Sequence, residues 1–224
     1  MSYTLHYGQV WGYVPYLLAG AVLTLQLAAI SFLAGALIGL LCASILSFGP
    51  RAARIAVRVY CTFFLNTPLL VQVFFIFFVL PEAGILLSPF TACAIGMSLN
   101  AGAYMAEIER AGFASLRRAE LDAAATLGFS LPQTIGFVIV PHIVRALFPP
   151  LSNQFIIQIM TTSLAAIFAV EELTGRAYNV NAQTFRTLEI FSILAVIYVA
   201  LTIVASAVLV VAGRRLFRVR ASVF

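Results

Sequence analysis

The segment from Glu120 to Pro141 reads ELDAAATLGFSLPQTIGFVIVP, and it brings polar residues into a chain that is otherwise strongly apolar. Of the 224 residues, 62% are hydrophobic and only 9% are charged, and the mean hydropathy is +1.05. These values lie outside the usual range of soluble domains and indicate an integral membrane protein. A polar helical segment that avoids lipid in such a protein is expected to contact another protein.

Five apolar stretches are each long enough to cross a hydrocarbon core of about 30 Å, which takes about 20 helical residues. They are Tyr16–Leu46, Val59–Leu80, Ile85–Ala106, Pro150–Val170 and Leu188–Ala212. Strands of a membrane barrel would instead alternate in short segments. The sequence therefore predicts an all-α protein with five transmembrane helices. The first stretch is too long for one upright helix, so we expect it to tilt or project, with its beginning in the interface near Trp11.

The distribution of arginine sets the predicted orientation. All 13 basic residues are arginines, and in a five-span arrangement only Arg176 and Arg186 fall on one side. The others fall on the opposite side: Arg51, Arg54, Arg58, Arg110, Arg117, Arg118, Arg145, Arg214, Arg215, Arg218 and Arg220. The positive-inside rule places this side, with the Glu120–Pro141 segment and the C-terminus, in the cytoplasm and the N-terminus outside. A basic face toward the cytoplasmic leaflet of the lipid bilayer explains the net charge of +5 without a nucleic-acid partner.

Residue types that the chain lacks or scatters exclude several kinds of chemistry. A P-loop needs a lysine to reach the phosphates of a nucleotide, and the chain contains no lysine. His6 and His142 are the only histidines and are predicted on opposite sides of the membrane, which argues against a metal site or a histidine-based triad. Cys42, Cys61 and Cys93 have no paired spacing and are expected to be small buried side chains. We therefore expect a chain that is not an enzyme and that binds no metal ion or cofactor itself.

Polar side chains inside the apolar stretches are not scattered. Such groups are costly in hydrocarbon unless they face protein or a water-lined cavity. The residues that we assign to a candidate substrate pathway are Asn66, Thr67, Gln72, Asn100, Tyr104, Glu107, Gln158, Thr161, Thr162 and Ser163. Hydrogen bonding between helices is an alternative explanation for each residue alone. For the set as a whole, the sequence favours a polar translocation pathway.

The first span also carries small residues on one face. Gly35 and Gly39 have the four-residue spacing of a small-xxx-small contact, which allows close approach of another helix. The contact partner can be a helix of this chain or of a partner subunit.

The Glu120–Pro141 segment has the signals of two short helices. An alanine-rich turn that begins at Asp122 ends at Gly128, and Ser130 and Pro132 suit the cap and first turn of a second helix, which Pro141 closes. The predicted structure is a cytoplasmic helix–turn–helix with a small-residue surface that another protein can approach closely. An ordinary connecting loop is the alternative.

These residues resemble the EAA loop of ABC-importer permeases, whose pattern is E-A-A, three residues, G, nine residues and then I-x-L-P. The pattern is filled here, with conservative departures, by Asp122-Ala123-Ala124, Gly128 and Val138-Ile139-Val140-Pro141. Further stretches are similar to signatures of the polar amino acid subfamily, which includes histidine, glutamine, arginine and opine permeases. These stretches are Asn66-Thr67-Pro68-Leu69-Leu70-Val71-Gln72, Ser98-Leu99-Asn100-Ala101-Gly102-Ala103-Tyr104, Thr162-Ser163-Leu164 and Glu172-Leu173-Thr174.

The resemblance implies a type I ABC importer permease of a bacterial inner membrane. The permease domain would span residues 16–213, after an extracytoplasmic or interfacial N-terminus at 1–15 and before a cytoplasmic tail at 214–224. The chain would pair with a second permease and with two cytoplasmic ATPase subunits, which use ATP and Mg²⁺. An extracytoplasmic binding protein would deliver a polar amino acid. The coupling loop at 112–142 would dock in a groove of the ATPase through Asp122, Ala123, Ala124, Gly128 and Pro141.

The resemblance also assigns the segment 171–187 to the binding protein. Glu171, Glu172, Arg176 and Tyr178 are the residues expected to contact it. A solvated connector is the alternative for any one of them.

Two departures from the subfamily concern substrate recognition. Many relatives carry Arg where Leu65 stands and Lys-Asp where Met160 and Thr161 stand. Loss of these charges would weaken recognition of the charged ends of an amino acid. We therefore hypothesise that the chain is one half of a heteromeric pair whose partner supplies more of the binding contacts.

A competing class is a secondary amino acid transporter or channel driven by an ion gradient. Such proteins often show inverted repeats or buried ionisable relays. The sequence shows no convincing repeat, and we attribute Glu107 and Glu109, near the cytoplasmic end of the third span, to ordinary interfacial solvation. A structural scaffold without transport would leave the polar faces unexplained.

Overall fold

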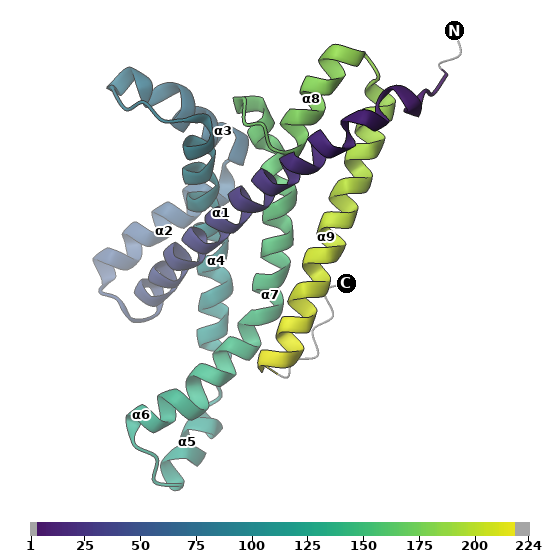
Figure 1. The fold of residues 1–224 in the computed structure, drawn as a ribbon. Helices are drawn as coiled ribbons and strands as arrows, with labels where there is room; N and C mark the ends of the chain where they lie inside the picture. Colours follow the sequence, from purple (N-terminus) through teal and green to yellow (C-terminus); the bar gives the residue numbers. More distant parts are fainter. Residues whose placement is uncertain (1–3, 218–224) are drawn as a thin grey trace.

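The computed structural model describes residues 4–217 and shows a bundle of helices from which one helical hairpin projects (Figure 1). The α-helices are α1 (Val14–Phe48), α2 (Arg51–Asn66), α3 (Leu69–Phe74), α4 (Pro89–Ala114), α5 (Arg118–Thr126), α6 (Leu131–Thr134), α7 (Val140–Thr161), α8 (Leu173–Thr184) and α9 (Thr187–Phe217). The 3-10 segments are η1 (Tyr7–Gln9), η2 (Trp11–Tyr13), η4 (Pro81–Ala83) and η6 (Thr162–Phe168), and the π segments are η3 (Phe75–Val79) and η5 (Ile135–Ile139). This range contains no β-strand, which confirms the all-α prediction. Arg218 and Arg220 lie outside the described residues.

Three helical stretches within residues 4–217 are long and apolar enough to cross a membrane: Tyr7–Phe48, Leu131–Phe168 and Thr187–Arg215. The pair α2 and α3 adds a fourth only if its two parts, bent by 107°, count as one span. α4, which corresponds to the third predicted span, does not join this group, because polar residues such as Ser98 and Asn100 lower its hydropathy. The count of five spans and the orientation of the termini stay predictions.

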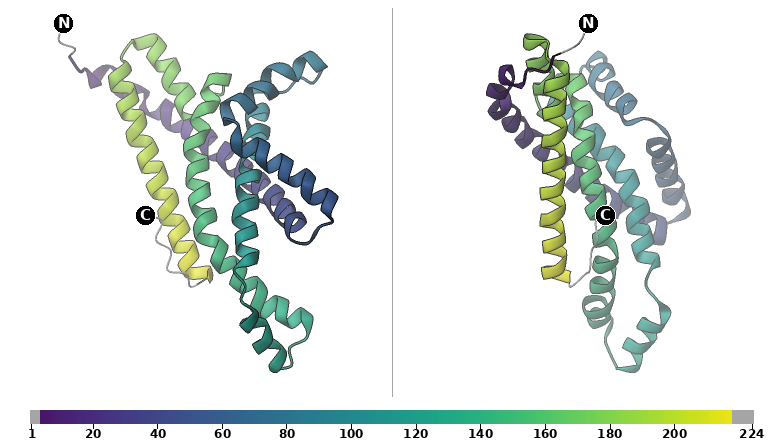
Figure 2. Two further views of the ribbon diagram at one scale, coloured as in Figure 1. Left: turned by 180° about the vertical axis from the view of Figure 1, so that it is seen from behind. Right: turned by 90° about the vertical axis from the view of Figure 1, so that its right-hand side faces the viewer.

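α1 is one continuous helix of 35 residues that crosses the bundle obliquely (Figures 1 and 2). Its glycines allow it to pack closely on α4. A Cβ at Gly35 would lie 2.7 Å from the Cβ of Ala101, and a Cβ at Gly39 would lie 2.7 Å from the Cβ of Met105. The small-residue contact predicted from the sequence is therefore made within this chain.

The second predicted span is not one helix. α2 ends at Asn66, and α3 begins at Leu69 after a sharp change of direction. Pro68 explains the break, because proline lacks a backbone N–H and disfavours helical geometry in the residue before it.

The fourth predicted span begins earlier than expected. The helical path runs from α6 through the π segment η5 into α7, so Pro141 lies in the first turn of α7 and does not close a helix. Pro150, predicted at the start of a span, lies inside α7 together with Pro149. The π segment η5 ends two residues before Pro141, and such a local change of helix type can accommodate a proline within a continuous helical path. Prolines inside membrane helices are tolerated where neighbouring groups satisfy the freed carbonyls.

A core cluster joins helices that are far apart in the sequence. Leu27 of α1, Val73 of α3, Met97 of α4 and Phe168 of η6 are all buried in it. Cys93 belongs to the same cluster, and the described cysteines are all buried and free, as predicted.

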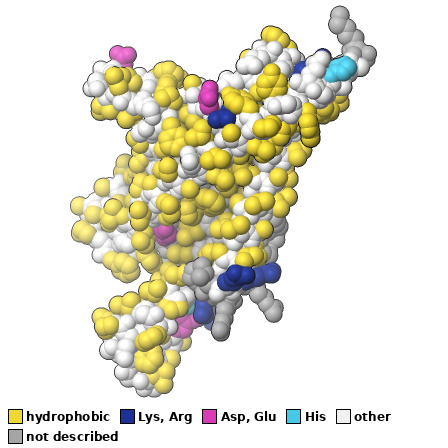
Figure 3. Space-filling view, viewed as in Figure 1, with side chains coloured by type: hydrophobic (Ala, Val, Ile, Leu, Met, Phe, Trp, Pro, Cys, Tyr) yellow, Lys and Arg dark blue, Asp and Glu magenta, His cyan; other side chains and the backbone are white. Residues whose placement is uncertain are grey.

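The two ends of the bundle carry different structures. The α5–α6 hairpin projects beyond one end, while α8 and the N-terminal segment lie at the other (Figure 2). Figure 3 shows hydrophobic side chains over most of one face of the bundle, with basic side chains gathered toward its two ends. This distribution fits a body that is surrounded by lipid between two polar ends.

Candidate functional site

The break between α2 and α3 is held by side-chain amides. In an unbroken helix the carbonyl of Phe64 would accept a hydrogen bond from residue 68, but Pro68 has no N–H to donate. Gln72 Nε2 donates to this oxygen at 3.0 Å, and Asn100 Nδ2 of α4 donates to it at 3.2 Å. Such replacement matters in a bilayer, where a freed carbonyl is costly unless protein groups or a water-filled cavity satisfy it.

Four of the predicted pathway residues meet at this break. Gln72 Nε2 also donates to the carbonyl of Thr67 at 3.0 Å, and Gln72 Oε1 accepts from Asn100 Nδ2 at 3.1 Å. Asn66 lies in the break as well, but its Nδ2 donates to Thr62 of its own helix at 2.7 Å. Broken helices of this kind line substrate sites in transporters. Their function in a substrate pathway stays a prediction for this chain.

The remaining pathway residues of α4 do not join that network. Tyr104, one turn after Asn100, is exposed, and Glu107 forms an ion pair with Arg110. Glu109 differs from its neighbour: it is buried, and its Oε2 has no hydrogen-bond partner in the described structure. Interfacial solvation is therefore the wrong explanation for Glu109, which packs against the gap that Gly39 leaves in α1.

The polar residues at the end of α7 accompany a change of helix type. The helix tightens into the 3-10 segment η6 at Thr162, and the hydroxyls of Thr161, Thr162 and Ser163 each donate to a carbonyl three or four residues earlier. Gln158 is buried, and its Nε2 lacks a partner within residues 4–217. A 3-10 stretch within a longer helix often marks a hinge. The structure thus places these four residues at a helix transition rather than along one open polar face.

Glu172 is an internal group rather than a surface contact. Its side chain is 0% exposed, and its Oε2 accepts from Thr24 of α1 and from Tyr198 of α9, each at 3.0 Å. Its Oε1 accepts from the N–H of Gly175 at 2.9 Å and caps α8. Burial raises the pKa of this carboxyl, while the hydrogen bonds oppose the rise. The predicted contact of Glu172 with a binding protein is therefore wrong, because the carboxyl ties together α1, α8 and α9.

The other residues assigned to the binding protein remain accessible. Glu171 and Tyr178 are exposed, and the half-buried Arg176 lies with its guanidinium carbon 4.6 Å from the ring centre of Tyr16. Arg176 also donates from Nη1 to the carbonyl of Tyr16 at 2.9 Å. Their contact with a binding protein stays a prediction.

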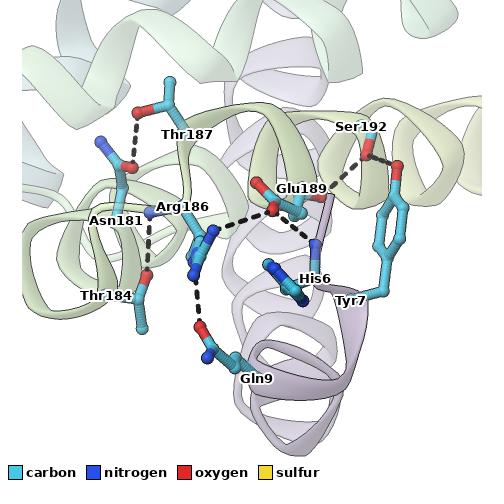
Figure 4. Close-up of polar contacts among 9 residues, drawn as sticks. All are labelled: His6, Tyr7, Gln9, Asn181, Thr184, Arg186, Thr187, Glu189 and Ser192. Carbon is cyan, nitrogen blue, oxygen red and sulfur yellow. Dashed lines mark hydrogen bonds and ion pairs between the residues drawn. The ribbon is translucent and has the colours of Figure 1, made fainter. Parts of the chain in front are cut away.

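A polar clasp, made by His6, Gln9, Arg186 and Glu189, attaches the N-terminal segment to the corner between α8 and α9 (Figure 4). The buried carboxylate of Glu189 accepts from the backbone N–H of His6 at 2.9 Å and lies 3.8 Å from Arg186 Nη1. Arg186 Nε also donates to Gln9 Oε1 at 2.9 Å. The clasp was not predicted from the sequence, although the spacing of Arg186 and Glu189 by three residues at a helix start was a usable signal.

The α5–α6 hairpin has the two helices that the sequence predicts. α5 ends with Gly128 in the left-handed region, at a φ of +76°. The N–H of Phe129 donates to Ala124, and the N–H of Gly128 donates to Ala125, each at 3.0 Å. These two bonds satisfy the last carbonyls of α5 and make a Schellman motif. A capping box then starts α6, where the N–H of Ser130 donates to the side chain of the third helical residue at 2.8 Å.

Some of the predicted coupling residues are exposed on the hairpin, and others are buried or half-buried. Asp122 and Ala123 are exposed on α5, whereas Ala124 of the same helix is buried where α5 packs against the α6–η5 path. Pro141 is half-buried at the base of the hairpin. There, Glu120 Oε2 lies 3.1 Å from His142 Nδ1 and links α5 to α7. Among the predicted coupling residues, Asp122, Ala123 and Gly128 are therefore accessible to another protein, while Ala124 holds the hairpin together.

Comparison with protein families gives a match over most of the chain. Residues 35–218 match a model described as "Binding-protein-dependent transport system inner membrane component". The chain is 39% identical over 202 residues to the glutamine transport system permease protein of Escherichia coli, which covers 89% of this chain and 92% of that protein. It is 37% identical over 205 residues to the L-cystine transport system permease protein of Bacillus subtilis, which covers 91% of this chain and 88% of that protein.

Solved structures show the same architecture. A crystal structure of an amino acid ABC transporter with histidines matches with a TM-score of 0.87 at 29% identity, over 96% of this chain and 100% of that chain. An inward-facing structure of a methionine ABC transporter matches with a TM-score of 0.65 at 14% identity, over 92% of this chain and 98% of that chain. The second likeness concerns the fold alone.

Proposed function

We propose that this chain is the permease subunit of an ABC importer for a polar amino acid. The chain belongs to the family of inner-membrane components of binding-protein-dependent transport systems. The relatives carry the names of glutamine and cystine permeases, which supports a polar amino acid as the substrate class. The proposed location is a bacterial inner membrane, with the hairpin in the cytoplasm and the α8 end outside.

The hairpin is the observation that carries this function. It projects from an apolar bundle with Asp122 and Ala123 exposed, and it is joined to two helices that carry polar pathway residues (Figure 1). α4 leads into α5 and holds Asn100, while α6 continues through η5 into α7, which ends at Thr161, directly before Thr162. A displacement of the hairpin by a cytoplasmic ATPase would therefore reach both polar regions through the helices that flank it. This connection is what an ATP-driven permease without its own nucleotide site requires.

The proposed partners follow from the same arrangement. Two ATPase subunits would hold the hairpins of two permeases, and an extracytoplasmic binding protein would contact Glu171, Arg176 and Tyr178. We propose that the second permease is a different chain, because uncharged Leu65 and Met160 stand where many relatives carry charged residues. The partner would then supply charges for the ends of the amino acid.

Reconstitution tests the proposed function. The chain is placed in proteoliposomes with its cognate ATPase, second permease and binding protein, and uptake of radiolabelled glutamine and cystine is measured with ATP on the ATPase side. We expect uptake that requires ATP and the binding protein and that continues when ionophores collapse proton and sodium gradients. The matched control contains an ATPase unable to hydrolyse ATP. Uptake driven by an ion gradient without any ATPase would establish a secondary transporter instead.

The same system tests the heteromeric assembly. We expect the chain with its partner permease to transport, and the chain alone with the ATPase to show no high-affinity amino acid binding in its own helices. A purified homodimer that binds and transports the amino acid would disprove this part of the proposal while leaving the ABC mechanism intact.

A further inference from the structure

An apolar cavity of about 430 Å³ lies between α1, α7 and α9, and none of the predicted pathway residues lines it. Its walls include Leu33 of α1, Phe148 and Phe155 of α7, and Leu209 of α9, and Ser152 is its single polar side chain. The volume falls within the range of about 300–1,000 Å³ that is common for small-molecule sites. The walls offer almost no hydrogen-bonding groups, so the cavity suits a hydrocarbon chain.

The cavity is fixed by packing. It spans the part of α7 that contains Pro149 and Pro150. Phe155 packs edge-to-face on Phe32 of α1, with ring centres 5.2 Å apart. Gly213 of α9 packs so closely on the ring of Phe148, a wall residue, that any side chain at 213 would collide with it. These contacts join all three helices at the cavity walls.

Arginines lie at the end of the cavity nearest the hairpin. Arg145 directly follows the wall residue Val144, and Arg214 and Arg215 directly follow the α9 residue that packs on Phe148. All three side chains are exposed, and none forms a hydrogen bond or ion pair with the described part of the chain. Figure 3 shows basic side chains gathered at this end of the bundle.

The nearby acidic group is already engaged. Glu120 shares a surface groove with Arg145 at the base of the hairpin, but its carboxylate lies 3.1 Å from His142. The predicted orientation places the arginines at the cytoplasmic surface of the membrane. An unneutralised basic cluster at that depth attracts anionic lipid headgroups.

We propose that the α1–α7–α9 cavity binds an anionic phospholipid of the cytoplasmic leaflet. One acyl chain lies among Leu33, Phe155 and Leu209, and the phosphate is held between Arg145 and the arginines of α9. A filled cavity regains the dispersion contacts that its walls would otherwise lack. Guanidinium groups donate hydrogen bonds in a geometry that matches phosphate oxygens. Both anionic and zwitterionic lipids can place an acyl chain in the cavity, but only an anionic lipid brings a net negative headgroup to the arginines. The site is therefore expected to select the anionic lipid.

Fluorescence quenching by brominated lipids tests this site in the assembled importer. Trp11 is the only tryptophan of the chain, so Trp11→Phe removes the background and Leu209→Trp places a reporter in the cavity wall. The signal of the same complex with Trp11→Phe alone is subtracted. We expect brominated phosphatidylglycerol to reach half-quenching at a lipid fraction at least fivefold lower than brominated phosphatidylcholine, since each basic residue near an anionic headgroup contributes about fivefold in affinity. Val208→Trp, the adjacent residue with 62% of its surface exposed, should be quenched equally by both lipids.

Arginine variants identify the headgroup site. Arg145→Gln combined with Arg214→Gln should abolish the preference of the Leu209→Trp reporter for phosphatidylglycerol. Arg51→Gln combined with Arg54→Gln changes the same predicted membrane face, but on α2, which does not line this cavity, and should retain it. Equal quenching of the reporter by both lipids would disprove anionic selectivity. A reporter that neither lipid quenches would disprove lipid occupancy and would indicate that a partner subunit covers the cavity.

Discussion

The left-handed backbone at Gly128 leads to a graded prediction for the hairpin. Its φ is +76°, and a Cβ built there would meet no atom within 4 Å, so a substitution has a conformational cost and no steric one. A residue with a Cβ in this region costs about 1–2 kcal/mol, with alanine at the low end and β-branched valine at the high end, whereas asparagine tolerates the conformation. The expected order of damage is therefore valine, then alanine, then asparagine.

The conformational cost can be measured as faster amide exchange, because it weakens the two hydrogen bonds that close α5. Because each 1.4 kcal/mol is tenfold in an equilibrium, we expect Gly128→Val to speed amide exchange at Phe129 by about 30-fold and Gly128→Ala by about fivefold. Binding-protein-stimulated ATP hydrolysis and uptake in proteoliposomes should fall in the same order, with Gly128→Asn close to wild type. Gly136→Ala is the matched control, since Gly136 has an ordinary φ and a Cβ added there would also meet no atom within 4 Å. Equal damage by asparagine and valine would refute the conformational reasoning and would indicate direct contact of a partner with Gly128.

Three further predictions concern the bundle. Gln72→Leu should lower the free energy of unfolding in detergent by about 1–3 kcal/mol, because it leaves buried polar groups unsatisfied. Asn66→Leu should cost less than about 1 kcal/mol, because the amide of Asn66 bonds only its own helix. Equal losses would show that Gln72 does not hold the break between α2 and α3. Gly39→Leu should destabilise the chain by about 1–3 kcal/mol or more, because its side chain would meet Met105 of α4, and an unchanged thermal midpoint would show that α1 and α4 do not pack as described. Burial raises the pKa of Glu172, so the folded state favours the protonated carboxyl. The contribution of Glu172 to stability is therefore fully present below about pH 4.3, the ordinary pKa of glutamate, and is lost as the pH rises through the raised pKa. Glu172→Gln should remove this pH dependence of the thermal midpoint, and identical profiles for variant and wild type would argue against it.

The parts of the fold that the sequence predicts well depend on local patterns. Apolar length marks α1 and α9, and the glycine and capping signals mark the hairpin, because each depends on a few neighbouring residues. α7 was predicted less well. Its prolines look like helix boundaries, yet the π segment before Pro141 and the surrounding helices let the helical path continue. Such outcomes depend on tertiary contacts that no local pattern records.

The candidate site shows the same division. The clustering of Gln72 and Asn100 follows from their places beside Pro68, and polar patterning was sufficient to select both. Glu172 and Glu109 were misjudged for a common reason, since a carboxylate is expected to be exposed unless its partners are known. The partners of Glu172 are Thr24 and Tyr198, which are far away in sequence on α1 and α9. Burial of an acidic group is thus decided by contacts between distant segments.

The distribution of packing suggests which parts of the permease deform and which move together. α1 and α4 are joined through Gly35 and Gly39 with so little free space that a methyl group would require the backbones to separate, and close-packed interfaces transmit displacement. The break at Pro68 and the 3-10 segment that begins at Thr162 have irregular backbone, and the break is held by amide side chains that can exchange partners. A push on the hairpin enters α4 and α7 together. The rigid α1–α4 pair would carry the motion, and the two irregular segments, which contain or lie beside most of the predicted pathway residues, would absorb it.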